Sequence, residues 1–448
     1  MESRGVASRS PAWGVVRWTV ARALGDYSTA KLSSQESMPA FPRIVITGIG
    51  VVTPIGSGRE SFWNALTAGT PGGGTIAAFD ATPYATQIAA ECRDFDPLAY
   101  MNRKLAGRMG RNSQMAVVAA MQAVQDAKLD LASFDTTRVG CCVGAAAGDF
   151  NTLEENHGEF LQRGAKAISP FCVPKVIPNM PAGNVAIALG IHGPNFAALS
   201  ACATGAHSIG MALMLLRTGQ ADVMLAGGVE STITPFVLNG YVAMGALSKR
   251  NDAPAKASRP FDKTRDGFVM GEGGGILVME TLEHALARGV EPICEVAGFG
   301  ATADAFGLAQ PDPEASWTTK AMQLALADAG MVPGDVQYVN AHGTSTPAND
   351  RSECKAILKV FGDAPPLVSS IKSMIGHTLG AAGAIEAAAT ALTIKHGIIP
   401  PTINYETPDE EIPLDVVPNV ARAVRVDAAL SNSFGFGGQN GVLALRRV

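Results

Sequence analysis

Residues 198–206 read Ala-Leu-Ser-Ala-Cys-Ala-Thr-Gly-Ala and centre on Cys202. An apolar run, 196–199, comes before the cysteine, and a long apolar segment, 209–216, follows it. This pattern predicts a strand, a tight turn and a helix, with the sulfur at the helix N-terminus. Unpaired N–H groups and the helix dipole favour a thiolate there, so we expect a lowered thiol pKa for Cys202.

Two further stretches place histidines where predicted strands give way to glycine-containing turns. Residues 338–347, Tyr-Val-Asn-Ala-His-Gly-Thr-Ser-Thr-Pro, contain His342, and residues 369–377, Ser-Ser-Ile-Lys-Ser-Met-Ile-Gly-His, contain His377. In α/β proteins, ligands bind outside the carboxyl ends of strands. A cysteine with two such histidines suggests covalent catalysis by a thiolate with help from imidazole. The alternative is a buried apolar cysteine and two core histidines.

Four motifs occur in order along the chain, at 43–54, 259–273, 376–386 and 432–441. With Cys202 and the histidines, they make the sequence resemble the elongating β-ketoacyl-acyl-carrier-protein synthases of the thiolase superfamily, over nearly the whole chain. The resemblance implies an α/β, thiolase-like layered fold, in which two similar βαβ halves with mixed sheets surround central helices. It also implies decarboxylative Claisen condensation of malonyl-carrier protein with an acyl thioester on Cys202, in fatty-acid chain elongation.

The same resemblance assigns roles to the candidate site residues. Cys202 is the nucleophile, and His342 and His377 donate hydrogen bonds to the enolate oxygen. Lys372 orients the histidines, and Phe434 gates the acyl pocket and shares an oxyanion hole with the N–H of Cys202.

More distant residues receive supporting roles from the resemblance. Glu386 supports the histidine and lysine network, and the hydroxyls of Thr344 and Thr346 bind the pantetheine amides. The expected docking patch for an acidic acyl-carrier protein consists of Arg103, Lys104, Arg108 and Arg111. The alternative for this basic cluster is a solvated helix face.

Strands and helices alternate along the chain, which is typical of βαβ units and a largely parallel sheet. We expect an N-terminal extension at 1–42, a first half at 43–292 and a second half at 293–448. Predicted strands lie at 43–54, 139–146, 222–228, 276–280, 293–296, 336–340, 429–434 and 441–445, and predicted helices at 112–128, 316–329 and 380–395. Residues 55–110 and 145–190 show little regular pattern, and the resemblance assigns them to a pocket cap and a dimer contact.

Composition excludes several classes of protein. The chain has 448 residues, of which 47% are hydrophobic and 17% charged, and its net charge is −5. This suits a large core and provides no basic field for nucleic acid. No apolar run reaches the ~18 residues of a membrane span. The seven cysteines lack a Cys-x-x-Cys pair, so we expect no structural zinc. We also expect no other metal and no cofactor.

Two expectations concern assembly and location. We expect a homodimer, because an unpaired sheet edge in so apolar a chain would aggregate. Residues 1–37 are rich in Arg and Ser, which is compatible with a mitochondrial or plastid transit peptide. We favour a disordered extension, or an upstream start of a chain that otherwise begins at Met38, and therefore a cytoplasmic location.

Residues 303–309 depart from the family pattern and keep a second pathway open. Elongating members commonly carry His-Met-Thr or His-Ile-Thr where this chain has Gly307, Leu308 and Ala309. A ketosynthase of a type II polyketide-like pathway is therefore an alternative. A non-catalytic chain-length partner subunit would lack the nucleophile, which Cys202 opposes. A thiolase would need a second cysteine near the C-terminus, and none follows Cys354.

Overall fold

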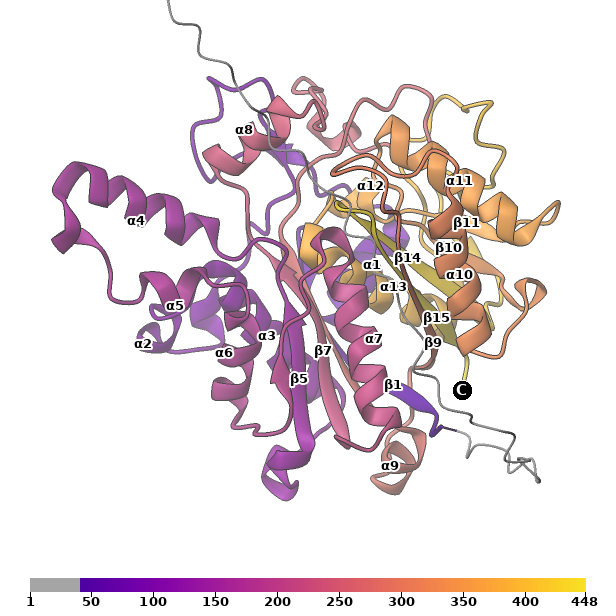
Figure 1. The fold of residues 1–448 in the computed structure, drawn as a ribbon, viewed down its shortest axis with the longest axis horizontal. Coiled ribbons are helices and arrows are strands. Elements are labelled where there is room, and N and C mark those ends of the chain that lie inside the picture. Colours follow the sequence, from indigo (N-terminus) through magenta and orange to yellow (C-terminus); the bar gives the residue numbers. More distant parts are fainter. Residues whose placement is uncertain (1–40) are drawn as a thin grey trace, which may run out of the picture. The chain divides into compact units, whose positions relative to one another are not determined.

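The computed structural model describes residues 41–448, which form one compact unit (Figure 1). The expected extension at 1–42, including Met38 and the candidate targeting segment, lies outside the described residues except for its last two positions. Among the residues described, no helix combines the length and apolar character needed to cross a membrane.

The first half of the chain contributes five main strands to a mixed sheet. In spatial order they are β1 (Ile44–Thr53), β8 (Gly273–Thr281), β7 (Val223–Glu230), β5 (Val139–Gly144) and β6 (Asn195–Phe196). The pairs β1–β8 and β8–β7 are antiparallel, whereas β7–β5 and β5–β6 are parallel. The expectation of a largely parallel sheet is therefore wrong for the strands next to β8, because β8 returns against both of its neighbours.

The second half repeats this order strand for strand. Its strands are β9 (Cys294–Ala303), β15 (Gln439–Arg446), β14 (Ala428–Gly435), β10 (Tyr338–Asn340) and β11 (Leu367–Ser369). The directions repeat as well: β9–β15 and β15–β14 are antiparallel, and β14–β10 and β10–β11 are parallel. The two first strands, β1 and β9, pair over two residues each and join the halves.

Four helices occupy equivalent places in the two halves. α3 (Arg111–Asp126) comes after β1 in the chain, and α10 (Ser316–Asp328) comes after β9. α7 (Thr204–Arg217) comes after β6, and α13 (Ala382–His396) comes after β11. The predicted helices at 112–128, 316–329 and 380–395 are thus confirmed as α3, α10 and α13. Nearly all of α13 is buried, which explains why its sequence shows no polar face.

The helices α7 and α13 pack against each other at the centre of the molecule (Figure 1). A Cβ atom on Gly205 would lie 2.5 Å from the Ala384 nitrogen, and one on Gly383 would lie 2.7 Å from the Ala206 nitrogen. Only glycine permits backbones to approach so closely. This contact brings the N-termini of both helices together, and those N-termini carry the site.

The predicted lack of regular structure at 145–190 is wrong. This stretch folds into α4 (Phe150–Arg163), α5 (Cys172–Val176) and α6 (Met180–Leu189), and α4 projects from the body of the chain in Figure 1. The remaining helices are α1 (Arg59–Ala68), α2 (Arg103–Ala106), α8 (Pro235–Ala243), α9 (Leu282–Ala287), α11 (Pro347–Phe361) and α12 (Lys372–Ile375). The short strands are β2 (Gly56–Ser57), β3 (Gly74–Thr75), β4 (Ile88–Ala89), β12 (Ile398–Ile399) and β13 (Arg422–Ala423).

Candidate active site

Cys202 lies at the centre of a 3-10 turn, Ala201–Ala203, that leads directly into α7. Ala201 has a φ of 48°, a left-handed conformation that is uncommon for a residue with a side chain. The turn therefore holds the cysteine in a sharply bent backbone. Its side chain lines a cavity of about 380 Å³ while only 6% of the residue is exposed. The predicted turn and helix are confirmed, with the strand shortened to β6.

Burial raises the pKa of the Cys202 thiol to about 11, although Lys372 and the N–H of Phe436 act to lower it. The lowered thiol pKa expected from the helix N-terminus is therefore wrong. Desolvation penalises the thiolate more than the nearby positive charge and N–H groups stabilise it. The resting cysteine is a neutral thiol at physiological pH.

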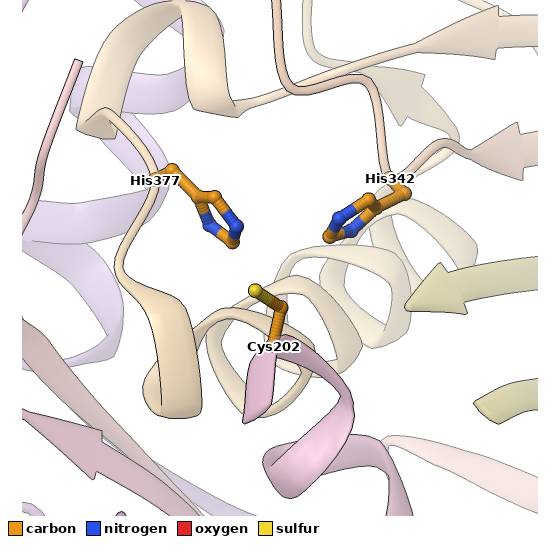
Figure 2. Close-up of side chains that lie close together, drawn as sticks. All are labelled: Cys202, His342 and His377. Atoms are coloured by element: carbon orange, nitrogen blue, oxygen red, sulfur yellow. The ribbon is translucent and has the colours of Figure 1, made fainter. Parts of the chain in front are cut away.

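The structure brings both histidines to Cys202. His342 follows β10 and His377 follows α12, and both side chains point toward the sulfur in Figure 2. The Cys202 Sγ and one ring nitrogen from each histidine lie within 4.8 Å of one another, a spacing that also suits a metal ion. The two rings are nearly perpendicular, with centroids 5.2 Å apart.

Both imidazoles are neutral, and their neighbours fix which nitrogen carries the proton. Burial lowers the pKa of His342 and of His377 well below the usual value, and Lys372 lowers both further. The N–H of Leu379 donates to His377 Nδ1 at 3.3 Å, and Lys372 Nζ lies 3.4 Å from His342 Nδ1. Because both Nδ1 atoms accept, each proton is on Nε2, and each ring is a hydrogen-bond donor.

Lys372 is buried at the start of α12, where it forms an ion pair with Glu386 of α13. Burial raises the pKa of Glu386 to about 7, against the opposing effect of Lys372. The lysine thus lies between this carboxyl and His342 Nδ1, as a group that orients the imidazole. The structure places Lys372 beside His342 and Glu386 behind the lysine.

The N–H group that faces the sulfur belongs to Phe436, not to Phe434. Phe434 pairs with Asn440 in the β14–β15 ladder, and its ring packs on His342 with centroids 5.7 Å apart. We therefore propose the Phe436 N–H, in place of the predicted Phe434 N–H, as the partner of the Cys202 N–H in the oxyanion hole. The β14–β15 ladder ends at Gly435, whose backbone already lies beside the Cys202 turn, and Phe436 follows it.

Thr344 and Thr346 line the same cavity, and their hydroxyls lie 2.9 Å apart. Tyr241, Phe268 and Leu379 add apolar walls near the sulfur. The cavity can therefore hold a polar arm on the threonine side and an acyl chain on the apolar side.

Glu353 is a site residue that the sequence analysis missed. Its carboxylate accepts from the N–H groups of His342 at 2.8 Å and Gly343 at 2.7 Å, and from Asn432 Nδ2 at 3.0 Å. It therefore fixes the backbone that carries His342. Glu353 lies within α11, and no motif in the sequence marks it.

The four predicted docking residues divide into two groups. Arg103, Lys104 and Arg108 are exposed in and beside α2. Arg111, however, donates to both carboxylate oxygens of Glu272, at 2.9 and 2.7 Å. Because the Arg111 guanidinium is paired with Glu272, we reduce the proposed docking patch to Arg103, Lys104 and Arg108.

Comparison with known proteins identifies the family. The sequence family described as "Beta-ketoacyl synthase, N-terminal domain" matches residues 42–285, and its "C-terminal domain" matches residues 293–406. A Coxiella burnetii protein named 3-oxoacyl-[acyl-carrier-protein] synthase 2 is 48% identical and covers 91% of this chain and 99% of its own. A Synechocystis protein of the same name is 47% identical, with 90% and 98% covered. This chain belongs to the β-ketoacyl synthase family, and it is a condensing acyltransferase.

Solved structures show the same fold. The ishigamide ketosynthase/chain length factor aligns with a TM-score of 0.87 at 36% identity and covers 91% of this chain and all of its own. A β-ketoacyl synthase from Burkholderia phymatum aligns with a TM-score of 0.85 at 37% identity, with the same coverage. The thiolase-like layered α/β fold expected from the sequence is confirmed.

Proposed function

We propose that this chain elongates fatty acyl chains by condensing malonyl-carrier protein with an acyl thioester held on Cys202. The observation that carries the proposal is the group formed by Cys202, His342 and His377, whose donor atoms lie within 4.8 Å in a mostly buried cavity. A nucleophile beside two neutral hydrogen-bond donors is what a carbanion-forming condensation requires. The curated relatives named 3-oxoacyl-[acyl-carrier-protein] synthase 2 support it.

The first half-reaction loads the enzyme. The Cys202 sulfur attacks the thioester carbon of the acyl-carrier protein, the bond to the carrier sulfur breaks, and the thiol proton ends on that sulfur. The N–H groups of Cys202 and Phe436 stabilise the negative oxygen of the tetrahedral intermediate. No net proton is released in this thioester exchange, because the carrier thiol takes up the proton that Cys202 loses. A resting neutral thiol is therefore compatible with it.

The second half-reaction forms the new carbon–carbon bond. The malonyl carboxylate leaves as CO₂, and its bonding electrons form an enolate whose oxygen accepts from the Nε2–H groups of His342 and His377. The enolate carbon attacks the acyl thioester, the bond to Cys202 breaks, and the released thiolate takes up a proton. The hydroxyls of Thr344 and Thr346 hold the pantetheine arm during this step.

The carrier protein docks on the exposed basic side chains of Arg103, Lys104 and Arg108. These charges attract an acidic partner although the net charge of the chain is −5. One solved relative, aligned at a TM-score of 0.85 and 32% identity, is a type II polyketide ketosynthase in complex with its acyl-carrier protein. Replacing the three cations by Ser should raise the KM for carrier substrates and leave kcat nearly unchanged.

A homodimer is the assembly that we propose. β6 ends the sheet with a free edge in the described chain, α6 packs beside it, and α4 to α6 carry exposed apolar side chains. Leu161 and Ile187 are each 70% exposed, and Val173 is 67% exposed. A second copy would cover such surface. Sedimentation at micromolar concentration should give twice the chain mass, and a monomer mass would contradict the proposal.

A type II polyketide-like pathway is the second candidate. Ala309 lines the cavity where the family pattern has a hydroxyl, and one solved neighbour is a type II polyketide ketosynthase. Mass spectrometry of the acyl group trapped on Cys202 distinguishes the two. A saturated acyl chain supports fatty-acid elongation, and a chain that keeps oxygens or double bonds supports the alternative. The cytoplasmic location stays a prediction.

A further inference from the structure

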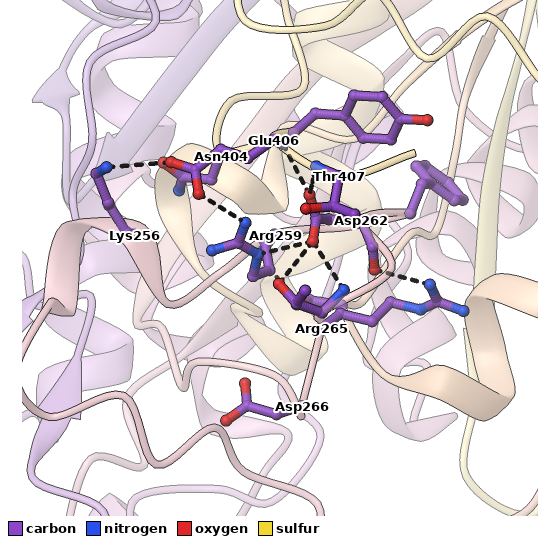
Figure 3. A network of polar contacts seen from close by, with 12 residues as sticks. Lys256, Arg259, Asp262, Arg265, Asp266, Asn404, Glu406 and Thr407 are labelled. Carbon is purple, nitrogen blue, oxygen red and sulfur yellow. Dashed lines mark hydrogen bonds and ion pairs between the residues drawn. The ribbon is translucent and has the colours of Figure 1, made fainter. Parts of the chain in front are cut away.

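Residues 259–265 of the motif at 259–273 do not line the cavity, yet their charged side chains form a buried network (Figure 3). Arg259, Asp262 and Arg265 are all buried. Charged side chains are rarely buried unless they are paired, and their burial calls for a structural or functional reason.

Asp262 fastens this segment to a loop of the second half. Its Oδ1 accepts from Arg259 Nε at 3.1 Å, and its Oδ2 accepts from the N–H groups of Glu406 at 2.7 Å and Thr407 at 2.6 Å. Burial acts to raise the pKa of Asp262, but these bonds hold it well below its usual value. The carboxylate is therefore charged and fixes the ends of both segments.

Arg265 and Asp350 carry the network to the active-site turn. Arg265 Nη1 donates to Asp409 at 2.7 Å, and its Nε lies 3.4 Å from Asp350 Oδ2. Asp350 is fully buried in the first turn of α11. Its Oδ2 accepts from the N–H of Phe261 at 2.9 Å, and the backbone of Ser345 is near enough to act on the pKa of the carboxyl. One carboxylate thus holds the 259–267 segment and the 342–346 turn together.

Both of these segments have unusual backbone conformations where they meet. Phe261 and Ser345, which are not glycines, have φ values of 67° and 71°. The N–H of Arg259 donates to Ser345 Oγ at 3.0 Å, and the N–H of Gly267 donates to the Ser345 carbonyl at 3.2 Å. Strained conformations persist only where the surroundings hold them. Asp350 accepts from the N–H of Phe261 and lies close to the backbone of Ser345.

We propose that Asp350, supported by Arg265, is a positioning residue that clamps the 259–267 segment onto the 342–346 turn. The clamp fixes His342 and the two threonines of the pantetheine site without touching substrate itself. The proposal rests on the proposed function, because it assigns the clamp to the malonyl half-reaction. The turn that carries Cys202 makes none of the hydrogen bonds described above, so acyl loading should be independent of the clamp.

The test compares the two half-reactions in the Asp350→Ala variant of the full chain. The substrates are malonyl-carrier protein labelled at its carboxyl carbon and a medium-chain acyl-carrier protein. We expect CO₂ release to fall about 100-fold, the scale that a misplacement of about one ångström can cost. At saturating carrier protein, the maximal rate of Cys202 acylation should stay within about twofold, because His342 acts only on the enolate and displaced threonines would raise the KM for both carriers alike. Asp350→Asn should restore part of the CO₂ release, since its amide oxygen can still accept from Phe261.

A second variant keeps the proposal testable if a lone buried Arg265 prevents folding. Arg265→Met with Asp350→Leu removes both charges, and apolar replacements of buried ion pairs often fold normally. The matched control is Lys256→Met, which alters an exposed ion pair with Glu406 at the rim of the network. We expect the double variant to melt cooperatively and lose CO₂ release selectively, and the control to match wild type.

Two results would overturn the clamp. One is a folded double variant that releases CO₂ at the wild-type rate, and the other is an equal loss of acylation and CO₂ release in Asp350→Ala. A wild-type chain that performs neither half-reaction would instead overturn the proposed function.

Discussion

Two turns of the same shape lie at the centre of this molecule, and their difference shows how the halves divide the reaction. Ala201–Ala203 leads into α7 and Leu379–Ala381 leads into α13, and both are 3-10 turns whose first residue has a φ of 48°. The middle residue is Cys202 in the first turn and Gly380 in the second. The same backbone turn therefore carries a nucleophilic side chain in the first half and no side chain in the second half.

The surroundings of Gly380 explain why its half cannot carry a side chain there. A Cβ atom on Gly380 would lie 2.5 Å from the Ala146 nitrogen, and the Gly380 N–H donates to Glu230 at 3.2 Å. The N–H of Leu379 in the same turn donates to His377. The first turn thus carries the sulfur that binds the acyl group, whereas the second turn orients His377, which donates a hydrogen bond to the enolate oxygen.

The largest effect should follow removal of the one side chain that distinguishes the turns. Cys202→Ala should abolish condensation, because Gly380 offers no second nucleophile and the other cysteines lie outside the cavity lining. The measurement is elongation of acyl-carrier protein with malonyl-carrier protein. A variant that still elongates would show that the acyl group is held elsewhere.

The pH dependence of Cys202 alkylation tests whether burial raises the pKa of this thiol. With a pKa raised to about 11, the thiolate fraction of Cys202 rises about tenfold per pH unit below that value. The rate of alkylation by iodoacetamide, followed by mass spectrometry of the Cys202 peptide, should therefore rise about 1,000-fold from about pH 7 to about pH 10. A plateau below about pH 8 would mean that the helix N-terminus outweighs burial.

The two phenylalanines beside the first turn should behave differently. Phe434 is buried against His342, so Phe434→Ala should cost about 3–5 kcal/mol of stability. Phe436 is less buried and follows the end of β14, so Phe436→Ala should cost less and slow acylation of Cys202 more. Melting and acylation are measured on both variants. The reverse pattern would support the gating role that the resemblance assigns to the Phe434 side chain.

A smaller loss of stability is expected when Gly380 of the second turn is replaced by a residue with a side chain. Gly380→Ala should cost about 1–3 kcal/mol, because the added methyl overlaps the backbone at Ala146. The shift should also slow malonyl decarboxylation, since His377 precedes the turn. Gly183→Ala is the matched control, because its Cβ would meet only the end of Met180 at 3.9 Å. Equal melting of the two variants would contradict the overlap.

The sequence predicted those features that depend on local pattern. The runs of apolar residues located β1, β7, α3 and α10, and the motifs located Cys202, His342, His377, Lys372 and Glu386. It did not predict the direction of β8, because strand direction depends on pairing between residues far apart in the chain.

The errors share this origin. The raised pKa of Cys202 depends on the depth of burial, which a neighbouring sequence of small residues does not reveal. Arg111 pairs with Glu272, a residue 161 positions away, so its commitment to the fold was invisible in the basic cluster. Phe434 and Phe436 are two positions apart, and only the end of the β14–β15 ladder shows which N–H reaches the sulfur.

The division of the reaction between the halves is tested most directly by measuring both half-reactions on two complementary variants. Cys202→Gln should lose acyl transfer and keep malonyl decarboxylation, because both neutral imidazoles remain. His342→Ala with His377→Ala should keep acylation of the cysteine and lose CO₂ release. If Cys202→Gln releases no CO₂, or if the histidine variant decarboxylates normally, the assignment of acyl transfer to Cys202 and of decarboxylation to the two histidines is contradicted.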